Sequence, residues 1–218
     1  MLPSNDLSQA VVVLIDDDGD VREALEGLFR SVGLNVEVFH SVAAYQDAVK
    51  PDRPGCMVLD VRLPGLSGLE FQEELARAKS RRPIVFISGH ADVEMCARAM
   101  KAGAVEFLTK PVRDQVLLDA VQAAIARDAQ IRRDDFERAR RHAGLALLTP
   151  REREVLAHVV AGRRNKQIAA DLGVSEGTVK LHRSQVMRKL DARSLADLVR
   201  IFDNFEGDRV TSDERQRT

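Results

Sequence analysis

The chain has 218 residues, of which 44% are hydrophobic and 31% charged, and its formal net charge is −1. This composition is typical of a globular protein, and the length favours two domains over one. No apolar run reaches the roughly 18 residues that a membrane span needs, and the first residues, MLPSNDLSQA, lack the pattern of a signal peptide. We therefore expect a cytoplasmic protein with no membrane partner.

The small net charge conceals an asymmetry between the two halves. Residues 1–126 hold 13 Lys and Arg against 19 Asp and Glu, a net of −6, whereas residues 147–203 hold 11 against 7, a net of +4. The C-terminal half is therefore the better candidate for binding a polyanion. The two cysteines, Cys56 and Cys96, have no Cys or His neighbour at metal-ligand spacing, and we expect both to be reduced packing residues.

Short apolar runs alternate with amphipathic segments through the first half. The runs, each expected to form a buried strand, cover residues 11–15, 36–39, 56–59, 84–87 and 104–108. Parallel neighbours need crossover connections, so five strand and helix repeats predict a doubly wound parallel sheet that is covered on both faces.

Helical periodicity predicts which side chains of the intervening helices point inward. In the fourth helix it selects Val93, Ala97 and Met100. In the fifth, which starts after Pro111, it selects Val112, Val116, Ala120, Val121, Ala124 and Ile125. Residues 127–141 are dominated by Arg, Asp and Glu and contain no Gly or Pro, so we expect them to continue this helix as a charged linker. A flexible tether is the alternative.

From residue 147 onward the pattern is all helical with very short connections. Thr149, Pro150 and Glu152 have the N-cap, first-turn and capping-box positions of a helix that runs through residue 161. A short helix over 165–172 follows, and Ser175 then caps a longer helix over 176–190. Residues 204–218 are too polar to pack, so a disordered tail is expected there.

Chemically active side chains follow the ends of the predicted strands. They are Asp16, Asp17 and Asp18 after the first strand, Asp60 at the third, Ser88 at the fourth and Lys110 after the fifth. In a doubly wound sheet the carboxyl ends of the strands meet at a shared cleft. Because carboxylates without a counterion repel one another, the cluster indicates a hard cation with oxygen ligands, and Mg²⁺ fits that description.

With a cation in place, Asp60 is the candidate nucleophile toward a phosphoryl group. Lys110 would stabilise a phosphoryl oxygen, and the Ser88 hydroxyl would donate to another after the transfer. The alternative for each residue taken alone is an ordinary solvated or helix-capping role. The combination of these residues at four strand ends favours a phosphoryl-transfer site over these ordinary roles.

The predicted helix over 176–190 has an apolar side and a polar side. Val179, Val186 and Leu190 lie on the apolar side. The other side presents Lys180, Leu181, Ser184 and Arg188, with Arg183 beside them. Such a face is expected of a recognition helix in a DNA major groove, although a solvated face of a helical bundle has the same periodicity.

Four segments of the first half resemble the receiver domain of response regulators: VVVLIDDDGDVR, VLDVRLPGLSG, FISGHADV and AVEFLTKP. The resemblance implies a flavodoxin-like fold in which Asp17, Asp60 and the main-chain carbonyl of Arg62 coordinate Mg²⁺ and Asp16 assists through water. It further implies that a sensor histidine kinase phosphorylates Asp60, and that Ser88 and Phe107 form a switch pair. The Lys110–Pro111 peptide bond matches one that is typically cis in receivers. His90 either modulates access of water to the phosphate or is a plain loop residue.

The second half resembles the LuxR-type helix-turn-helix domain in LTPREREVL, NKQIAADLGVSEGTVKLHRSQVMRKL and SLADLVRI. Together with the first half, this resembles the NarL/FixJ class of response regulators. The residues expected near bases are Lys180, Leu181 and Ser184, and those expected near phosphates are Asn165, Lys166, Gln167, Thr178 and Arg183. Ser184 departs from the basic side chain of some relatives, and we expect His182 to pack within the domain.

The resulting prediction is a receiver over 1–126, a helical linker over 127–146 and an all-α, four-helix DNA-binding domain over 147–203. Phosphorylation of Asp60 would switch homodimerisation, through the face formed by residues 93–121, and binding to paired half-sites in double-stranded DNA. RNA polymerase is a further candidate partner. Whether the unphosphorylated receiver blocks the recognition helix or fails to dimerise stays open.

Two other functions compete with this prediction. A LuxR-type regulator could respond to a ligand or a partner protein without phosphorylation, but the set of Asp60, Ser88 and Lys110 argues against it. An aspartyl-phosphate phosphatase would need an acid two residues after its nucleophile, where this chain has Arg62. We therefore expect no metabolic enzyme, and only self-phosphorylation and autodephosphorylation as part of switching.

Overall fold

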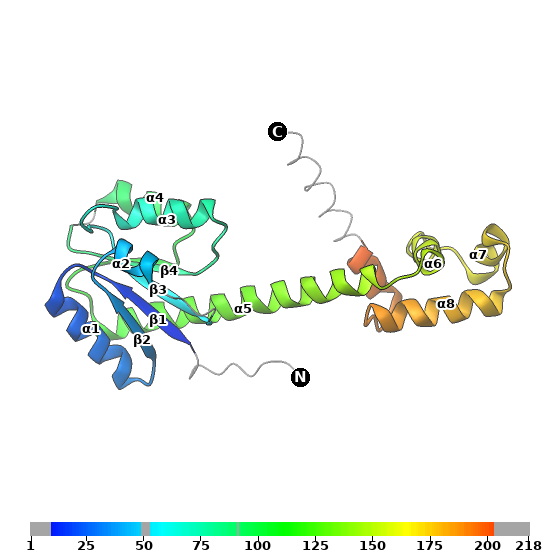
Figure 1. Cartoon of the computed structure of the whole chain (residues 1–218), viewed down its shortest axis with the longest axis horizontal. Coiled ribbons are helices and arrows are strands. Elements are labelled where there is room, and N and C mark those ends of the chain that lie inside the picture. Colours follow the sequence, from blue (N-terminus) through cyan, green and yellow to red (C-terminus); the bar gives the residue numbers. More distant parts are fainter. Residues whose placement is uncertain (1–9, 49–52, 91, 203–218) are drawn as a thin grey trace. The chain divides into compact units, whose positions relative to one another are not determined.

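The computed structural model describes residues 10–48, 53–90 and 92–202 and divides into two compact units, 1–134 and 135–218 (Figure 1). The tail predicted over 204–218 lies outside the described residues. In the described ranges, every helix is too short or too polar to cross a bilayer.

Unit 1 is built on a five-stranded sheet. Its strands are β1 (Val11–Ile15), β2 (Asn35–Phe39), β3 (Gly55–Asp60), β4 (Ile84–Ser88) and β5 (Glu106–Thr109). All neighbours are parallel, in the order β2-β1-β3-β4-β5, which confirms the doubly wound sheet. Strand β5 begins two residues later than predicted, because the amide of Ala104 bonds to the carbonyl of Ala99 and closes the preceding helix.

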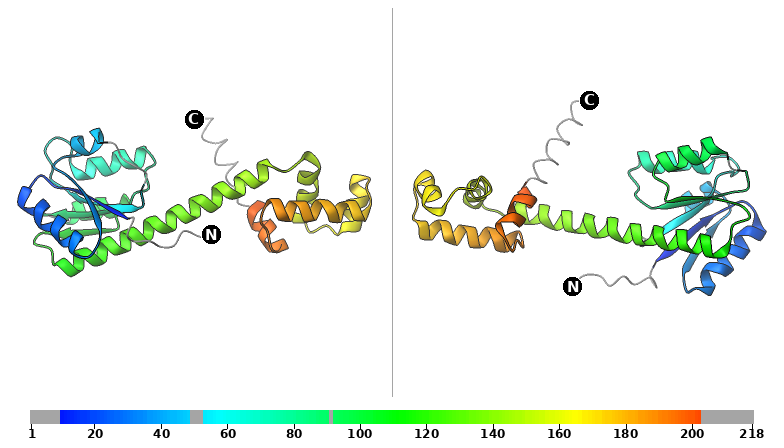
Figure 2. Two further views of the ribbon diagram at one scale, coloured as in Figure 1. Left: turned by 60° about the horizontal axis from the view of Figure 1, so that its bottom comes forward. Right: turned by 180° about the vertical axis from the view of Figure 1, so that it is seen from behind.

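Helices cover both faces of the sheet (Figure 2). They are α1 (Gly19–Ser31), α2 (Val42–Asp47), α3 (Gly68–Arg77), α4 (Val93–Lys101) and α5 (Asp114–Ala146). Alternate strand residues enter two cores, as the pleat requires. Leu14, Val58 and Ile87 pack with α1 and α5, whereas Ile15 and Phe86 pack with α2, α3 and α4.

The inward faces of α4 and α5 were partly mispredicted. Val93 is 86% exposed and Met100 42% exposed, Ala97 is also exposed, and the buried residue of α4 is Ala99. Val116 of α5 is 44% exposed as well. Helix α5 starts at Asp114 rather than directly after Pro111, and its buried stripe is Leu117, Leu118, Ala120, Val121, Ala124 and Ile125.

Beyond this stripe, α5 is fastened to the start of β3. The buried carboxylate of Asp128 accepts a hydrogen bond from the amide of Gly55 (2.9 Å) and pairs with Nε of Arg132 (2.8 Å). Arg132 also donates to the carbonyl of Arg53 (2.9 Å). Because Asp128 has both a donor amide and a cation, its charge is compensated where it is buried.

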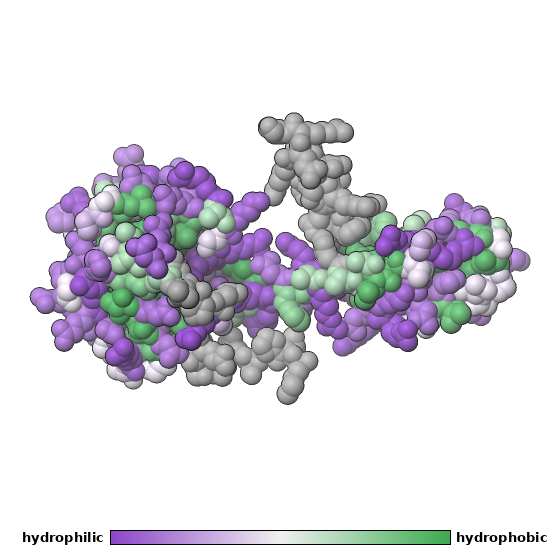
Figure 3. All heavy atoms as spheres, viewed as in Figure 1, coloured by the Kyte–Doolittle hydropathy of each residue, from purple (hydrophilic) through white to green (hydrophobic). Residues whose placement is uncertain are grey.

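Unit 2 is all helical, with α6 (Pro150–Val160), α7 (Asn165–Leu172), α8 (Glu176–Lys189) and a further helical segment over 195–202. The side chains of Thr149 and Glu152 form the predicted capping box of α6, and Ser175 caps α8. The buried carboxylate of Glu152 also pairs with Lys189 at the end of α8 (2.6 Å). The apolar core includes Val155, Ile168, Val179, Val186 and Leu198. Most of the visible surface of both units is hydrophilic (Figure 3).

Candidate functional site

A lysine joins two carboxylates at the carboxyl ends of the strands. The Nζ atom of Lys110 lies 2.6 Å from Oδ2 of Asp16 and 2.7 Å from Oδ2 of Asp60. Asp60 is the last residue of β3, Asp16 follows β1 and Lys110 follows β5, so three strand ends supply one charged cluster. The structure therefore brings these three residues together as the sequence predicts.

Both carboxylates are largely removed from solvent. Asp16 is 0% exposed and Asp60 is 6% exposed. Burial raises the pKa of Asp16 above its ordinary value, although the hydrogen bond from Lys110 opposes this shift. Burial alone would lower the pKa of Lys110, but its bonds to the two carboxylates raise the pKa on balance. The two carboxylates therefore favour the protonated, cationic form of Lys110.

Asp17 completes a cluster with the chemistry of a cation site. One carboxylate oxygen from each of Asp16, Asp17 and Asp60 lies within 4.8 Å of the others. Of the three residues, Asp17 is the one exposed to solvent. Three carboxylates carry more negative charge than the single Lys110 cation compensates, and hard oxygen ligands suit Mg²⁺. The residues present therefore fit a divalent cation. Arg62, on the neighbouring loop, donates its amide to Oδ1 of Asp60 (3.1 Å).

Ser88 ends β4 in a fully buried position beside this cluster. Its hydroxyl donates to the carbonyl of His90 (3.0 Å) and accepts from the amide of His90 (3.3 Å). The carbonyl of Ser88 accepts from the amide of Lys110 (2.8 Å), and the Lys110–Pro111 peptide bond is cis. The Ser88 hydroxyl is therefore bonded to the backbone of His90, while the Ser88 carbonyl helps to position Lys110.

Phe107 of β5 lies partly buried against the second core. Its ring centroid is 6.0 Å from that of Phe86, with the ring planes tilted by 33°. The ring is neither fully exposed nor fully buried.

Two residues shape the site that the sequence did not assign to it. Nη1 of Arg22, on α1, donates to the main-chain carbonyl of Asp16 (2.7 Å). At Gly68, a β-carbon would lie 2.2 Å from the carbonyl oxygen of Asp60, so only glycine lets α3 approach the end of β3. The bond from Arg22 depends on the folded position of α1, and no spacing rule predicts it.

In unit 2, the polar side of α8 is open to solvent. Lys180, Ser184 and Arg188 are exposed, and Leu181 is 58% exposed, whereas Val179 and Val186 are buried. The side chains expected near bases therefore project outward from one helix. His182 is partly buried.

The residues expected near phosphates lie in the first turns of α7 and α8, except for Arg183, which lies in the middle of α8. Nη1 of Arg183 donates to Oδ1 of Asn165 (2.6 Å), so the two side chains are held together. Lys166 and Gln167 are exposed in the first turn of α7, and Thr178 lies in the first turn of α8, where its hydroxyl bonds to that of Ser175. Helix N-termini and exposed cations are both suited to phosphate.

Comparison with known proteins matches both units. The response regulator receiver domain matches residues 12–122, and the family described as bacterial regulatory proteins, luxR family, matches residues 146–202. Nodulation protein W of Bradyrhizobium diazoefficiens is 51% identical over 198 residues, which cover 91% of this chain and 87% of that protein. The chain belongs to the response regulator family.

Other relatives place it in the NarL/FixJ class of response regulators. The transcriptional regulatory protein FixJ of Azorhizobium caulinodans is 44% identical over 190 residues, covering 87% of this chain and 90% of the relative. The solved structure of the response regulator StyR is 44% identical and superposes with a TM-score of 0.80, covering 90% of this chain and 99% of StyR. Full-length FixJ from B. japonicum is 37% identical, with a TM-score of 0.56, and the match covers 88% of this chain and 95% of that one.

This response regulator is thus a transcription factor with a receiver and a LuxR-type DNA-binding domain, as the sequence predicts. Receivers generally bind Mg²⁺ at their acidic pocket and work with a sensor kinase, and LuxR-type domains bind DNA.

Proposed function

We propose that Asp60 is the phosphoacceptor of this response regulator. The observation that carries the proposal is the position of the Asp60 carboxylate. It lies at the end of β3, 2.7 Å from the ammonium group of Lys110. An oxygen of Asp60 attacks the phosphorus of a phosphohistidine on the sensor kinase. The new O–P bond forms as the P–N bond breaks, which leaves an acyl phosphate on Asp60 and an imidazole on the kinase.

Asp16, Asp17 and Asp60 would hold Mg²⁺, together with the main-chain carbonyl of Arg62. Their support is the cluster of three carboxylates, of which Asp16 and Asp60 are buried and Asp17 is exposed. When bound, the cation supplies positive charge that stabilises phosphoryl oxygens. Arg22 orients this set through its bond to the carbonyl of Asp16.

Lys110 and Ser88 respond to the phosphoryl group. Lys110 exchanges part of its contact with the carboxylates for a phosphoryl oxygen. The Ser88 hydroxyl, now bonded to His90, turns to donate to another oxygen, and Phe107 moves with it. Water attacking the phosphorus later releases inorganic phosphate and restores the carboxylate, so the phosphorylated state is transient.

In the DNA-binding domain, Lys180, Leu181 and Ser184 would read bases in the major groove. Their support is their exposure along one side of α8. Phosphate contacts would come from Asn165, Lys166, Gln167, Thr178 and Arg183. One domain offers too few contacts for tight specific binding, so we infer a homodimer on paired half-sites. The exposed apolar side chains of Val93, Met100 and Val116, on α4 and α5, suit the dimer face.

We further propose that the protein works in the cytoplasm, where it meets its kinase, promoter DNA and RNA polymerase. The competing mechanism within the family is control by a ligand or a partner protein without phosphorylation.

A matched pair of variants tests the phosphoacceptor. Asp60→Asn removes the nucleophile at nearly constant shape, and Asp47→Asn changes an exposed carboxylate at the end of α2. Full-length proteins would be treated with Mg²⁺ and acetyl phosphate, and with beryllofluoride at fixed salt. We expect wild type and Asp47→Asn to gain one acid-stable, base-labile phosphate, to dimerise and to bind DNA more tightly. Equal responses in Asp60→Asn, or none in any protein, would reject the proposal and favour a ligand-controlled regulator.

A further inference from the structure

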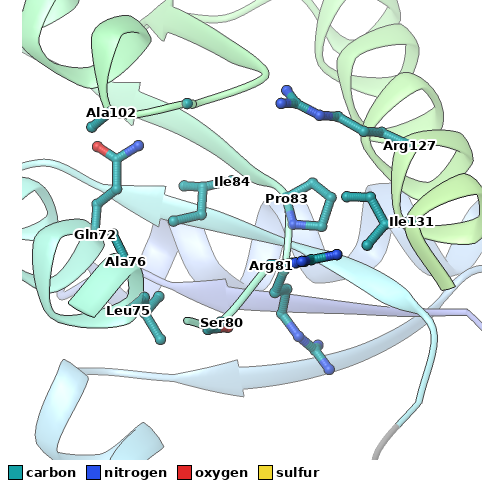
Figure 4. Close-up of a pocket in the computed structure, with 12 residues that line it drawn as sticks. Gln72, Leu75, Ala76, Ser80, Arg81, Pro83, Ile84, Ala102, Arg127 and Ile131 are labelled. Atoms are coloured by element: carbon teal, nitrogen blue, oxygen red, sulfur yellow. The ribbon is translucent and has the colours of Figure 1, made fainter. Parts of the chain in front are cut away.

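A pocket opens at the opposite end of the receiver sheet from the carboxylate cluster. It has a volume of about 240 Å³ and lies between α3, the loop into β4, the turn after α4, and α5 (Figure 4). We call it the basal pocket and define it by Leu75, Arg81, Pro83, Arg127 and Ile131. None of these residues takes part in the phosphorylation site.

The lining of the basal pocket combines an apolar floor with cations. Ile131 of α5 lies beside Pro83, and the side chain of Arg127 extends from α5 toward the side of the pocket where Ala102 lies (Figure 4). Arg81 and Arg82 line the loop side. Among the described residues, those that line the pocket include no Asp or Glu. This contrasts with the net charge of −6 over residues 1–126, and it favours an anion over a cation or a neutral molecule.

The walls of the basal pocket are held by bonds outside it. The side-chain Nε2 of the buried Gln72 donates to the main-chain carbonyl of Ala99 (3.1 Å) and so ties α3 to α4. The bonds of Asp128 to Gly55, at the start of β3, and of Arg132 to Arg53, just before it, hold the opposite wall, α5. Arg82 donates to the carbonyl of Arg53 (3.2 Å), which anchors the loop. A pocket with fixed walls loses little entropy when it binds a small molecule.

We propose that the basal pocket binds a small organic anion with an apolar body, such as an aromatic carboxylate. The carboxylate pairs with Arg127 and Arg81, and the apolar body covers Ile131 and Pro83. Because the ligand then contacts both the loop before β4 and α5, it stabilises the part of α5 that follows the receiver core. This site is independent of phosphorylation, so it adds a second input to the receiver.

The test uses 2-naphthoate as the probe and 2-naphthamide, which has nearly the same shape but no charge, as its control. Titrations of the ¹⁵N-labelled full chain at fixed salt give both the affinity and the location from amide shifts. We expect shifts at residues 72–84, 102–103 and 127–131, and at least tenfold weaker binding of the amide. Arg127→Gln should weaken naphthoate binding about two- to fivefold, as expected for an exposed ion pair. Arg113→Gln, an exposed arginine just before α5, should leave binding unchanged.

Three outcomes would overturn the proposal. Equal binding of the acid and the amide would make the pocket an apolar crevice without selectivity for anions. Shifts confined to the basic surface of the DNA-binding domain would show binding elsewhere. Absence of saturable shifts at millimolar probe would show that the basal pocket binds no such anion. Asp60→Asn should bind the probe like wild type, which separates this proposal from the phosphoacceptor.

Discussion

The ammonium group of Lys110 lies 2.6 Å from the carboxylate of Asp16, a residue with no solvent exposure. The same ammonium group also contacts the carboxylate of Asp60 at 2.7 Å, so one lysine bonds to two buried carboxylates.

Lys110→Met should destabilise the receiver by about 3 kcal/mol in the absence of Mg²⁺, the lower end of the range for removing one partner of a buried ion pair, because it leaves Asp16 and Asp60 without a cation. Added Mg²⁺ should recover most of the loss by supplying positive charge to the same carboxylates. Urea unfolding followed by circular dichroism, with and without Mg²⁺, measures both effects. Lys101→Met, at the exposed end of α4, is the control. Equal losses in the two variants, or no recovery with Mg²⁺, would contradict the assignment.

Ser88→Ala should take up phosphate but respond weakly to it, because the hydroxyl is needed after the transfer. We expect the gain in DNA affinity on adding beryllofluoride to fall at least about fivefold, the lower range of allosteric coupling. Ser88→Thr keeps a hydroxyl and should keep most of the response. Fluorescence anisotropy with labelled DNA measures the gain, and an undiminished response in Ser88→Ala would remove this residue from the switch.

Glu152 makes the stability of the DNA-binding domain depend on pH. Burial raises its pKa, but bonds from Lys189 and Thr149 outweigh this, so the pKa lies below its ordinary value of 4.5. A lowered folded-state pKa gives stability that is present above about pH 4.5 and is lost as the pH falls through the folded-state value. Glu152→Gln should be less stable than wild type at pH 7, and its free energy of unfolding should change less with pH below pH 5. Guanidinium unfolding at several pH values tests this. If the free energy of unfolding changed with pH in the same way in both proteins, the prediction would be refuted.

Lys166 and Lys180 should affect DNA binding in different ways. Lys166→Ala, at a proposed phosphate contact, should weaken specific and non-specific binding alike and lower the salt slope by about one. Lys180→Ala, at a proposed base contact, should cost about 1–3 kcal/mol on selected DNA and little on random DNA. Arg153→Ala, an exposed residue of α6, is the control. If both lysine variants lost the same affinity on selected and on random DNA, with the same change in salt slope, α8 would not read bases as proposed.

Much of the fold was predictable because buried parallel strands have a simple signature. Runs such as Val11–Ile15 are apolar at every position since both faces of the sheet are covered, and a polar residue such as Asp60 marks where the strand ends. The carboxylate cluster follows from the same logic, because parallel strands place their carboxyl ends on one edge of the sheet.

Other features depend on three-dimensional packing that periodicity does not contain. Val93 and Met100 have helical spacing, but α4 packs chiefly through Ala99, so they are exposed. The contact of Arg22 with Asp16 and that of Asp128 with Gly55 each join a side chain to a backbone group of another element, the second across 73 residues of the chain. The limits of the domains and the roles of the site residues remain predictions.

Strand β3 carries Asp60 at its carboxyl end and donates the amide of Gly55, at its other end, to Asp128 of α5. A chimera that joins this receiver to a foreign output domain needs a junction in α5. The hydrogen bond between Gly55 and Asp128 determines where that junction can lie. A junction after Asp134 keeps the contacts of Asp128 and Arg132. A junction after residue 126 deletes both and leaves the amide of Gly55 without its acceptor. The graft then loses its hydrogen-bonded link to the strand that bears Asp60.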